Sequence, residues 1–158
     1  MCSIRPSRRD DHETLLALWR RSVEATHIFL SRQDIDFYYP LVRRFLASGI
    51  EILVLCDETT ETGIMGFMVL DVPEGTQGAE AKIEALFIDP PHIRKGLGSR
   101  LVAFAKKGRV ALTLDVNEAN PNAKAFYNRM GFRKTGRSPV DGAGKPFPLV
   151  HMAWSAKE

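Results

Sequence analysis

Apolar and polar positions alternate along the first part of the chain with the period of an α-helix. Leu15, Trp19 and Val23 recur every four residues within 10–26, which predicts an amphipathic helix. A second helical pattern places Leu41, Val42, Phe45 and Leu46 on one face. Pro40 is expected to kink this helix or to separate it from the preceding turn. Two helices are therefore expected ahead of the apolar segments that follow.

The middle of the chain changes to the patterns of β-strands. Apolar runs at 50–57 and 63–72 are separated by a short polar segment, which predicts a hairpin, and 81–89 alternates between two faces. Further strands are expected at 3–7, 109–116, 132–138 and 147–154, and further helices begin near Leu97 and Pro121. The order β-α-α-β-β-β-α-β-α-β-β predicts a single α/β domain with hairpins rather than a doubly wound sheet.

Composition places the chain among ordinary globular proteins. Its 158 residues are 44% hydrophobic and 26% charged, and no apolar run approaches the length of about 18 residues that a membrane span needs. The basic N-terminal segment lacks the apolar stretch of a secretory signal. Cys2 and Cys56 lack the spacing of a metal site or redox motif, so we expect free thiols, a cytoplasmic protein and no membrane partner.

The net charge of +3 is a weak excess of basic residues, which suits an anionic ligand. Pairs of adjacent basic residues are spread through the chain, so solvated helix faces are favoured over a nucleic-acid-binding stripe, and no nucleic acid is expected. His12, His92 and His151 show no metal-ligand spacing. The sequence therefore predicts no metal.

The stretch HIRKGLGSRL, residues 92–101, combines two glycines, two basic residues and the start of a helical pattern. Glycines let the backbone approach a ligand, and the first N–H groups of a helix are donors without intrahelical partners. Arg94 and Lys95 add positive charge. The spacing matches neither a Walker A loop nor a G-x-G-x-x-G fingerprint. Alone, the stretch leaves two alternatives open: a phosphate-binding loop, or a helix that begins after a flexible turn.

The strand EALFIDP, the K-G-L-G turn that opens a helix and the downstream pattern N-x-x-A-x-x-F-Y-x-x-x-G-F together resemble the GNAT superfamily of N-acetyltransferases. The resemblance covers nearly the whole chain. It implies a mixed, V-shaped β-sheet flanked by helices on both faces, with acetyl-coenzyme A in the gap between two central parallel strands. The segments SVEATHIFL and GRSPVDGAGKPFPL resemble a YjaB-like bacterial branch of the superfamily.

The resemblance implies a set of cofactor-binding residues. The ALFI strand would give backbone hydrogen bonds to the pantetheine arm and the thioester carbonyl, and residues 94–99 would wrap the pyrophosphate. Ile93 stands where the family usually has Gln or Arg, which weakens the motif match more than the chemistry, because backbone N–H groups do most of the binding. The implied residues are Leu86, Phe87, Ile88, Arg94, Lys95, Gly96, Leu97, Gly98, Ser99, Asn117, Asn122 and Tyr127.

Tyr127 matches the F-Y position of the family, which implies a general acid. A phenol of pKa about 10 can protonate a leaving thiolate whose acid has a pKa of about 8.5. Packing on the helix face beside Phe126 is the alternative. Asn122 would bind the pantetheine arm or order Tyr127, or it supports the helix start. Asn117 is a candidate for the cofactor, or an ordinary turn residue.

Glu84 lies in the middle of an otherwise apolar strand, at a position where many superfamily members have an acidic residue. A carboxylate there needs a partner or a raised pKa, so Glu84 is a candidate catalytic base, with a water chain or a salt-bridged glutamate as alternatives. Glu24 and His27 share one face at the end of the first helix, where the superfamily forms its acceptor wall. An ordinary helix-terminal histidine is the alternative for His27. Asp141 lies in a loop that would overhang the acceptor.

These residues together predict an enzyme that transfers an acetyl group from acetyl-coenzyme A to a primary amine. The acceptor is a small molecule or a protein lysine or N-terminus, and it attacks directly in a ternary complex. No cysteine lies in the motif segments, which favours direct transfer. A non-catalytic acyl-coenzyme A sensor on the same fold is the competing function, and a nucleic-acid-binding domain is a more distant one. The sequence leaves open the acceptor and whether the chain forms a homodimer.

Overall fold

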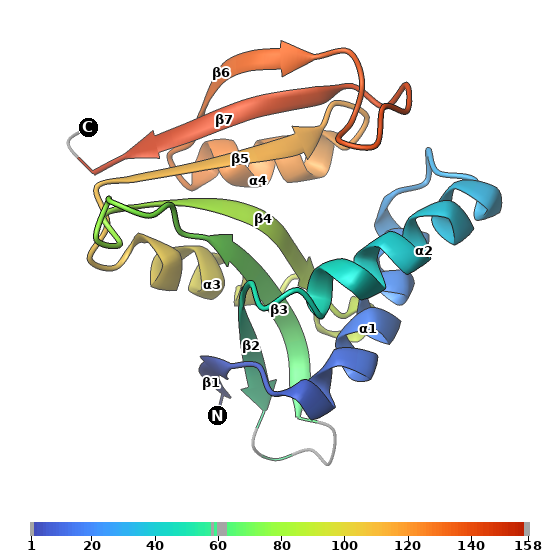
Figure 1. The fold of residues 1–158 in the computed structure, drawn as a ribbon, viewed down its shortest axis with the longest axis horizontal. Coiled ribbons are helices and arrows are strands. Elements are labelled where there is room, and N and C mark those ends of the chain that lie inside the picture. Colours follow the sequence, from blue (N-terminus) through green and yellow to red (C-terminus); the bar gives the residue numbers. More distant parts are fainter. Residues whose placement is uncertain (1, 58, 60–62, 157–158) are drawn as a thin grey trace. The chain divides into compact units, whose positions relative to one another are not determined.

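A computed structural model of the chain describes residues 2–57, 59 and 63–156. Within them, four α-helices, two short 3-10 helices and seven strands follow one another (Figure 1), and no helix combines the length and apolar character that a membrane crossing requires. The chain divides into two compact units. The first comprises residues 1–70 and 85–101 and the second comprises residues 71–84 and 102–158, so two strands and one helix contribute to both, one of the strands only by its last residue, Asp71.

The first unit contains two helices and the strands beside them. Its elements are β1 (Cys2–Pro6), α1 (His12–Thr26), α2 (Arg32–Leu46), β2 (Glu51–Asp57), β3 (Ile64–Asp71), the second half of β4 (Glu80–Ile88) and the start of α3 (Leu97–Lys106), with 3-10 turns at Arg9–Asp11 and Pro90–His92. Strand β1 pairs antiparallel with β2, and β2 pairs antiparallel with β3. This pairing confirms the hairpin predicted from the two apolar runs.

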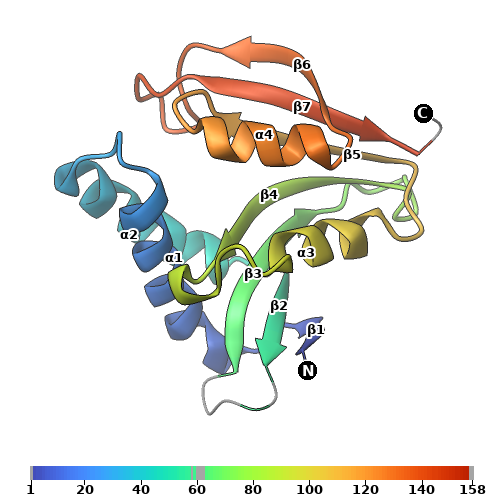
Figure 2. The same cartoon turned by 180° about the vertical axis from the view of Figure 1, so that it is seen from behind.

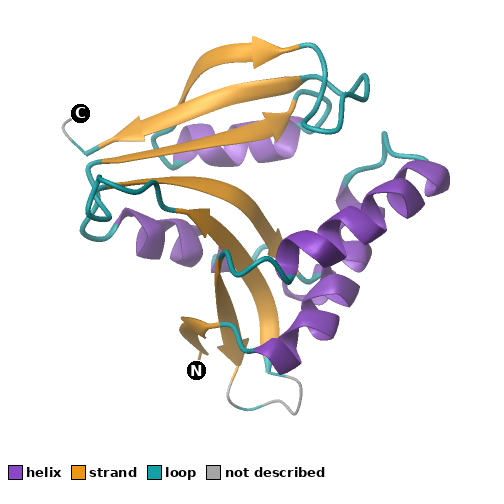
Figure 3. Ribbon diagram, in the orientation of Figure 1, coloured by secondary structure: helices purple, strands orange, loops and turns teal. Residues whose placement is uncertain are grey.

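The hydrophobic core of the first unit lies between helices α1 and α2 and one face of strands β2 and β3 (Figure 3). Alternate strand residues point into it, among them Val54 and Phe67, which are almost completely buried, and Trp19 of α1 belongs to the same cluster. The intervening residues, such as Leu55 and Met68, are also buried. Both faces of these strands are therefore covered, which explains why their sequences are continuously apolar.

Helix α2 begins at Arg32 and runs through Pro40, so of the two effects expected of this proline, separation of the helix from the preceding turn is wrong. The Ser31 hydroxyl accepts a hydrogen bond from the Asp34 N–H at 3.0 Å, and the Asp34 carboxylate accepts one from the Ser31 N–H at 2.9 Å. This reciprocal capping box fixes the true start. Asp36 and Pro40 are both exposed, so the Asp36 carbonyl, which lacks its usual intrahelical donor, lies on a solvated side of the helix.

The second unit holds the remaining strands and helices. Its elements are the first half of β4, the remainder of α3, β5 (Ala111–Asn117), α4 (Pro121–Arg129), β6 (Arg133–Ser138) and β7 (Leu149–Ser155). Strand β5 pairs parallel with β4 and antiparallel with β7, and β6 pairs antiparallel with β7. The described strands form one seven-stranded mixed sheet of order β1-β2-β3-β4-β5-β7-β6, which confirms the predicted α/β fold class.

The two faces of the sheet differ within the second unit. Leu112, Leu114 and Val116 of β5 are buried, and α4 packs along the sheet (Figure 2). The intervening positions of β5 and β7, which include Asp115 and His151, are half-buried or exposed. Because strand residues alternate between faces, these side chains share the other side of the sheet, which we call the polar face.

Candidate active site

The loop between β4 and α3 presents backbone N–H groups at the start of a helix. Helix α3 begins at Leu97, and the hydrogen bond that opens it runs from the Arg100 N–H to the Gly96 carbonyl at 3.2 Å. The N–H groups that precede Arg100 at the helix start therefore have no acceptor within the helix. They lie at the positive end of the helix dipole, where an anion such as a pyrophosphate is favoured.

Two residues of this loop have left-handed backbone conformations. Gly96 has a φ of 75° and Arg94 a φ of 69°, a region that non-glycine residues rarely adopt. A Cβ atom added to Gly96 would meet no heavy atom within 4 Å, so the backbone angle rather than lack of space favours glycine there. Arg94, Lys95 and Gly96 are exposed. The turn is thus open to a ligand, as a phosphate-binding loop requires.

Strand β4 extends beyond its pairing with β5. The parallel ladder ends at the pair Ile83 and Leu114, whereas β4 continues to Ile88. Beyond the ladder, backbone groups on that side of β4 can hydrogen-bond a ligand. Gly66 on β3 allows a close approach to this part of β4, because an added Cβ atom would lie 2.9 Å from the Phe87 carbonyl oxygen. The segment predicted to bind the cofactor is therefore fixed in place from β3.

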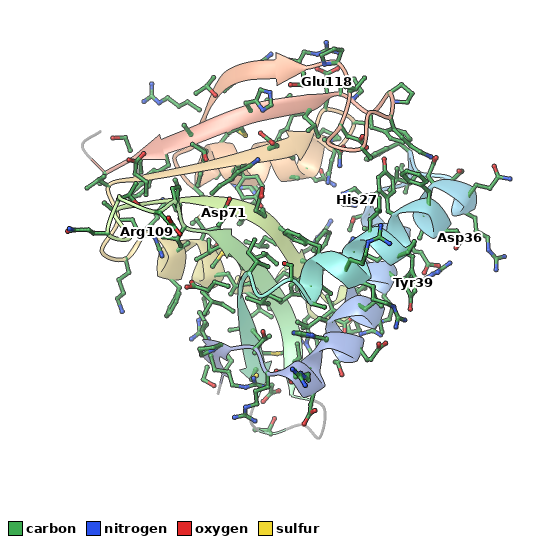
Figure 4. The ribbon with its side chains drawn as sticks, viewed as in Figure 1. His27, Asp36, Tyr39, Asp71, Arg109 and Glu118 are labelled. Carbon is green, nitrogen blue, oxygen red and sulfur yellow. The ribbon has the colours of Figure 1, made fainter. Side chains whose placement is uncertain are left out.

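A cavity of about 660 Å³ opens at the end of α1 and the start of α2 in the first unit. Figure 4 labels His27 at the end of α1 and Asp36 on α2. The residues that line the cavity are Arg20, Glu24, His27, Ile28, Leu30, Arg32 and Ile35. Glu24 on α1 and His27 at its C-terminal end, both predicted to bind the acceptor, thus line the same cavity.

His27 is held in one neutral tautomer by its neighbours. The Thr26 hydroxyl donates its single hydrogen to the Ser22 carbonyl at 2.7 Å. It therefore accepts a hydrogen bond from the His27 Nδ1, which lies 2.8 Å away. Burial lowers the pKa of His27 to about 4, so at neutral pH the ring is uncharged and its Nε2 carries a lone pair.

The charges around the cavity are shared between two helices. The carboxylate of Glu24 lies 3.4 Å from the Arg20 guanidinium, which also pairs with Asp36 of α2 at 2.9 Å. Glu24 is exposed, and its positive partner is divided between two carboxylates. The His27 ring lies 6.3 Å from the Phe87 ring of β4, measured between centroids. The cavity therefore combines a partly neutralised carboxylate with an uncharged imidazole close to β4.

Tyr127 lies on α4 in the second unit and is 9% exposed. Its ring makes edge contacts with Phe126 and Phe132, with centroids 5.0 and 5.6 Å apart. Burial raises the pKa of Tyr127 above its ordinary value, so the phenol keeps its proton at neutral pH and is a weaker acid than a tyrosine in water. The geometry fits both the general acid and the packing role that the sequence left as alternatives.

Asn117 and Asn122 lie on either side of the turn between β5 and α4. Asn117 ends β5, and its carbonyl accepts a hydrogen bond from the Asn120 N–H at 3.0 Å. The cap of α4 is Asn120, whose side chain accepts a hydrogen bond from the Ala123 N–H at 3.2 Å. Asn122 is therefore not the cap; it is exposed in the first turn of α4 and accessible to a ligand.

Glu84 has an ion-pair partner on its own strand. Its carboxylate lies 3.1 Å from the Lys82 Nζ, which also lies 3.0 Å from the Asp115 carboxylate. Burial lowers the pKa of Lys82, but hydrogen bonds to the two carboxylates outweigh this and raise the pKa overall. The charged ammonium group stabilises the Glu84 carboxylate, which is the salt-bridged arrangement that the sequence left open.

Asp141 shapes the loop between β6 and β7. Its Oδ1 accepts hydrogen bonds from the Ala143 N–H at 3.0 Å and the Lys145 N–H at 2.9 Å. Its own N–H donates to the Lys145 carbonyl at 3.0 Å, and Gly144, with a φ of 80°, allows the tight turn. The residue predicted to bind the acceptor thus organises its own loop.

Sequence reasoning missed a cluster around His151. Its ring lies between the Asp115 carboxylate and the Ser138 hydroxyl, and these residues come from β7, β5 and β6. The sequence spacing of the histidines bears only on metal ligands. It gives no information about Asp115 and Ser138, which lie on other strands. In the described part of the chain, no three His, Cys, Asp or Glu residues are grouped as a metal ion would require.

Comparisons with known proteins bear on this site. Residues 48–134 match a family described as an acetyltransferase (GNAT) domain. The chain is 40% identical over 154 residues to the peptidyl-lysine N-acetyltransferase YjaB of Salmonella typhimurium, which covers 98% of this chain and 99% of that protein. It is similar to the solution structure of apo-form YjaB from Escherichia coli, with 42% identity, a TM-score of 0.84, and coverage of 98% of this chain and 97% of that one. A crystal structure of PaiA N-acetyltransferase from Thermoplasma acidophilum in complex with coenzyme A shares the fold, with 22% identity, a TM-score of 0.75, and coverage of 98% of this chain and 99% of that one.

Proposed function

The chain belongs to the GNAT superfamily of N-acetyltransferases, and from this premise we propose that it acetylates lysine side chains of proteins or peptides. As a member of this superfamily it is an enzyme that takes its acetyl group from acetyl-coenzyme A, as the sequence motifs predicted. The observation that carries the acceptor class is the similarity, over nearly the whole chain, to relatives named peptidyl-lysine N-acetyltransferases.

The cavity at the end of α1 suits the end of a lysine side chain. The Glu24 carboxylate attracts an ammonium group, and the positive charge of Arg20 in the same lining is paired with Glu24 and Asp36, while Arg32 is exposed. His27, uncharged at neutral pH because its pKa is lowered, does not repel the ammonium group. The Nε2 of His27 accepts a hydrogen bond from that ammonium group. Ile28 and Leu30, also in the lining, provide apolar contacts for the methylene chain.

Bound acetyl-coenzyme A supplies the acetyl group as an activated thioester. The residues proposed to hold it do so mainly through their backbone. The exposed turn at Arg94, Lys95 and Gly96 and the N–H groups of residues 97–99 bind the pyrophosphate. The backbone of residues 86–88 in β4 orients the thioester and stabilises negative charge on its carbonyl oxygen. Asn117 and Asn122 contribute side-chain hydrogen bonds to the pantetheine arm.

Amine acetylation requires that one proton leaves the acceptor and another reaches the leaving thiolate. Glu84, whose carboxylate pairs with Lys82, and His27, held as a neutral imidazole, are the proposed proton acceptors. Tyr127 is the proposed donor to the thiolate, through a phenol that remains protonated at neutral pH because burial raises its pKa. The amine attacks the thioester directly in this reaction, with both substrates bound.

The acceptor class can be tested with a panel of lysine-containing peptides, each paired with a control in which the lysine is replaced by arginine and the N-terminus is blocked. We expect thiol release from acetyl-coenzyme A and ε-acetyl-lysine, found by mass spectrometry, only with the lysine peptides. Turnover restricted to polyamines or free amino acids would contradict the acceptor class. Coenzyme A binding without turnover of any amine would favour the non-catalytic sensor.

A cytoplasmic location and a homodimeric state stay predictions of the sequence. The two free thiols, Cys2 and Cys56, suit a reducing compartment. Cell fractionation with antibody detection tests the location. Light scattering of the purified protein, with and without coenzyme A, tests the oligomeric state.

A further inference from the structure

Three side chains on the polar face of the second unit form a hydrogen-bonded chain. Asp115 of β5 and His151 of β7 are direct partners in the antiparallel ladder, and the Asp115 carboxylate lies 2.5 Å from the His151 Nδ1. The Nε2 of the same ring lies 2.7 Å from the Ser138 hydroxyl on β6. Ser138, His151 and Asp115 thus occupy the positions of a nucleophile, a base and an orienting carboxylate.

The sheet positions the histidine ring for this arrangement. Gly136 of β6 lies opposite His151, and a Cβ atom added to Gly136 would lie 3.4 Å from the His151 Cδ2. The absence of a side chain leaves room for the ring to lie across β6. Its Nε2 then reaches Ser138, two residues further along the same strand face. A register shift between Lys134 and Gly136 sets this alignment.

With the His151 ring in its neutral form, the hydrogens in this chain have one direction. Burial raises the pKa of Asp115, but hydrogen bonds from His151 and from Lys82, at 3.0 Å, outweigh this and lower it overall, so the carboxylate is ionised and accepts. The His151 Nδ1 therefore carries the hydrogen, and in the neutral ring Nε2 accepts from the Ser138 hydroxyl. Every donor points from Ser138 through His151 to Asp115, as activation of a serine oxygen requires.

We propose that Ser138 is a nucleophile that takes an acetyl group from small activated acetyl esters and thioesters and passes it to water. His151 Nε2 removes the hydroxyl proton while the Ser138 Oγ bonds to the carbonyl carbon. The bond from this carbon to the leaving oxygen or sulfur breaks, and the leaving group takes the proton from His151. A water molecule then attacks the acetyl-serine, with His151 taking the water proton and returning it to Ser138, and acetate is released.

The edge position of β6 leaves backbone donors that can stabilise the negatively charged oxygen formed when Ser138 attacks the ester and when water attacks the acetyl-serine. Strand β6 is last in the strand order, so alternate backbone N–H groups of this strand point away from β7. Because Pro139 has no N–H, the donor beside Ser138 comes from Arg137 or from Ser138 itself. Such donors stabilise the oxygen of a tetrahedral intermediate. Hydrolysis through Ser138 needs no amine and does not depend on the residues proposed to bind coenzyme A, so it is separable from the amine acetylation proposed above.

The test on the unmodified protein uses two probes that need no coenzyme A site. A fluorophosphonate probe reacts with activated serines, and we expect mass spectrometry of the folded protein to locate it on Ser138. With p-nitrophenyl acetate, we expect nitrophenolate release and, after acid quenching, an acetyl group on the same residue. A folded protein that carries neither label on Ser138 overturns the proposal.

Two variants test the roles of Ser138 as nucleophile and His151 as base. Ser138→Ala and His151→Gln should each lower nitrophenolate release roughly 100-fold, the size of effect typical for loss of a nucleophile or general base. Ser155→Ala, which changes a serine of the neighbouring strand β7, is the matched control and should keep the wild-type rate. Circular dichroism checks that each variant folds. Wild-type ester hydrolysis by folded Ser138→Ala would refute the proposal whether or not peptides are acetylated.

Discussion

Arg21 and Asp89 join helix α1 to the residue that follows strand β4. The arginine Nε and Nη2 lie 3.0 and 2.9 Å from the two oxygens of the carboxylate, a two-point contact. The Asp89 N–H also donates to the Met65 carbonyl of β3 at 2.8 Å. The start of the 92–99 loop is therefore held from both α1 and β3, and α1 also carries part of the cavity wall.

Replacing Arg21 by Met removes this contact and keeps much of the length of the side chain. Because the Arg21 side chain is 50% exposed, we expect a loss of about 1 kcal/mol or less in the free energy of unfolding. We expect kcat/KM for acetyl transfer to fall about tenfold, because the loop and the cavity wall lose their shared support. Arg44→Met, at an exposed arginine of α2, is the control. Equal kinetics for the two variants would contradict this role.

The protonation of His27 links stability to pH. Its pKa is 6.5 in the unfolded chain and about 4 in the folded protein, because burial disfavours the charged ring. Above pH 6.5 the His27 ring is neutral in both the folded and the unfolded state, so its titration takes nothing from the free energy of unfolding. As the pH falls from 6.5 towards 4, the unfolded chain gains a proton that the folded protein does not, so stability decreases, by at most about 3 kcal/mol.

Urea unfolding of wild type and His27→Gln across this pH range measures the effect. The variant should lose less stability on acidification than the wild type, since it lacks the group that titrates only in the unfolded state. His12→Gln, at the first residue of α1, controls for the loss of a histidine elsewhere. Parallel pH curves for wild type and His27→Gln would show that His27 is not held neutral by burial.

Comparing substitutions at two glycines distinguishes an effect on ligand binding by the loop from an effect of backbone strain on stability. Gly96 and Gly108 have φ angles of 75° and 73°, and a Cβ atom on either would meet nothing within 4 Å. Replacement by Val should therefore cost a similar roughly 1–2 kcal/mol of stability at both positions. Only Gly96→Val should weaken coenzyme A binding, by about tenfold or more, because it lies in the proposed pyrophosphate loop. Isothermal titration calorimetry measures this, and equal affinities would refute the loop assignment.

Elements that depend on neighbours in sequence could be predicted. The four-residue spacing of Leu15 and Trp19 has the period of α1, and the glycine turn before Leu97 marks the start of α3. The start of α2 could not be read in the same way, because Pro40 is a strong local signal for a helix boundary. The proline is tolerated on an exposed side of the helix, and the Ser31 cap outweighs it.

Contacts between strands were harder to predict, because they depend on register. Asp115 and His151 are 36 residues apart, and only the antiparallel pairing of β5 with β7 places them opposite each other. One partner was accessible from the sequence: Lys82 and Glu84 are two positions apart on a strand and must share a face. That spacing predicts the ion pair which the structure contains, and it favours the salt-bridged glutamate that was one of the alternatives for Glu84.

Tyr127→Phe tests the proposed proton donor with little disturbance of the fold. The ring contacts with Phe126 and Phe132 remain, so we expect stability within about 1 kcal/mol of wild type. Acetyl transfer loses its donor, and thiol release should fall roughly 100-fold while coenzyme A affinity changes little.

Tyr39→Phe is the matched control for Tyr127→Phe. The Tyr39 hydroxyl accepts a hydrogen bond from Arg43 on the surface of α2, and it has no proposed role in transfer. Its loss should leave thiol release unchanged. Thiol release at the wild-type rate in Tyr127→Phe would assign this residue to packing alone. A parallel loss of coenzyme A affinity and turnover would instead place its hydroxyl in cofactor binding, because a group that acts only in proton transfer leaves binding unchanged.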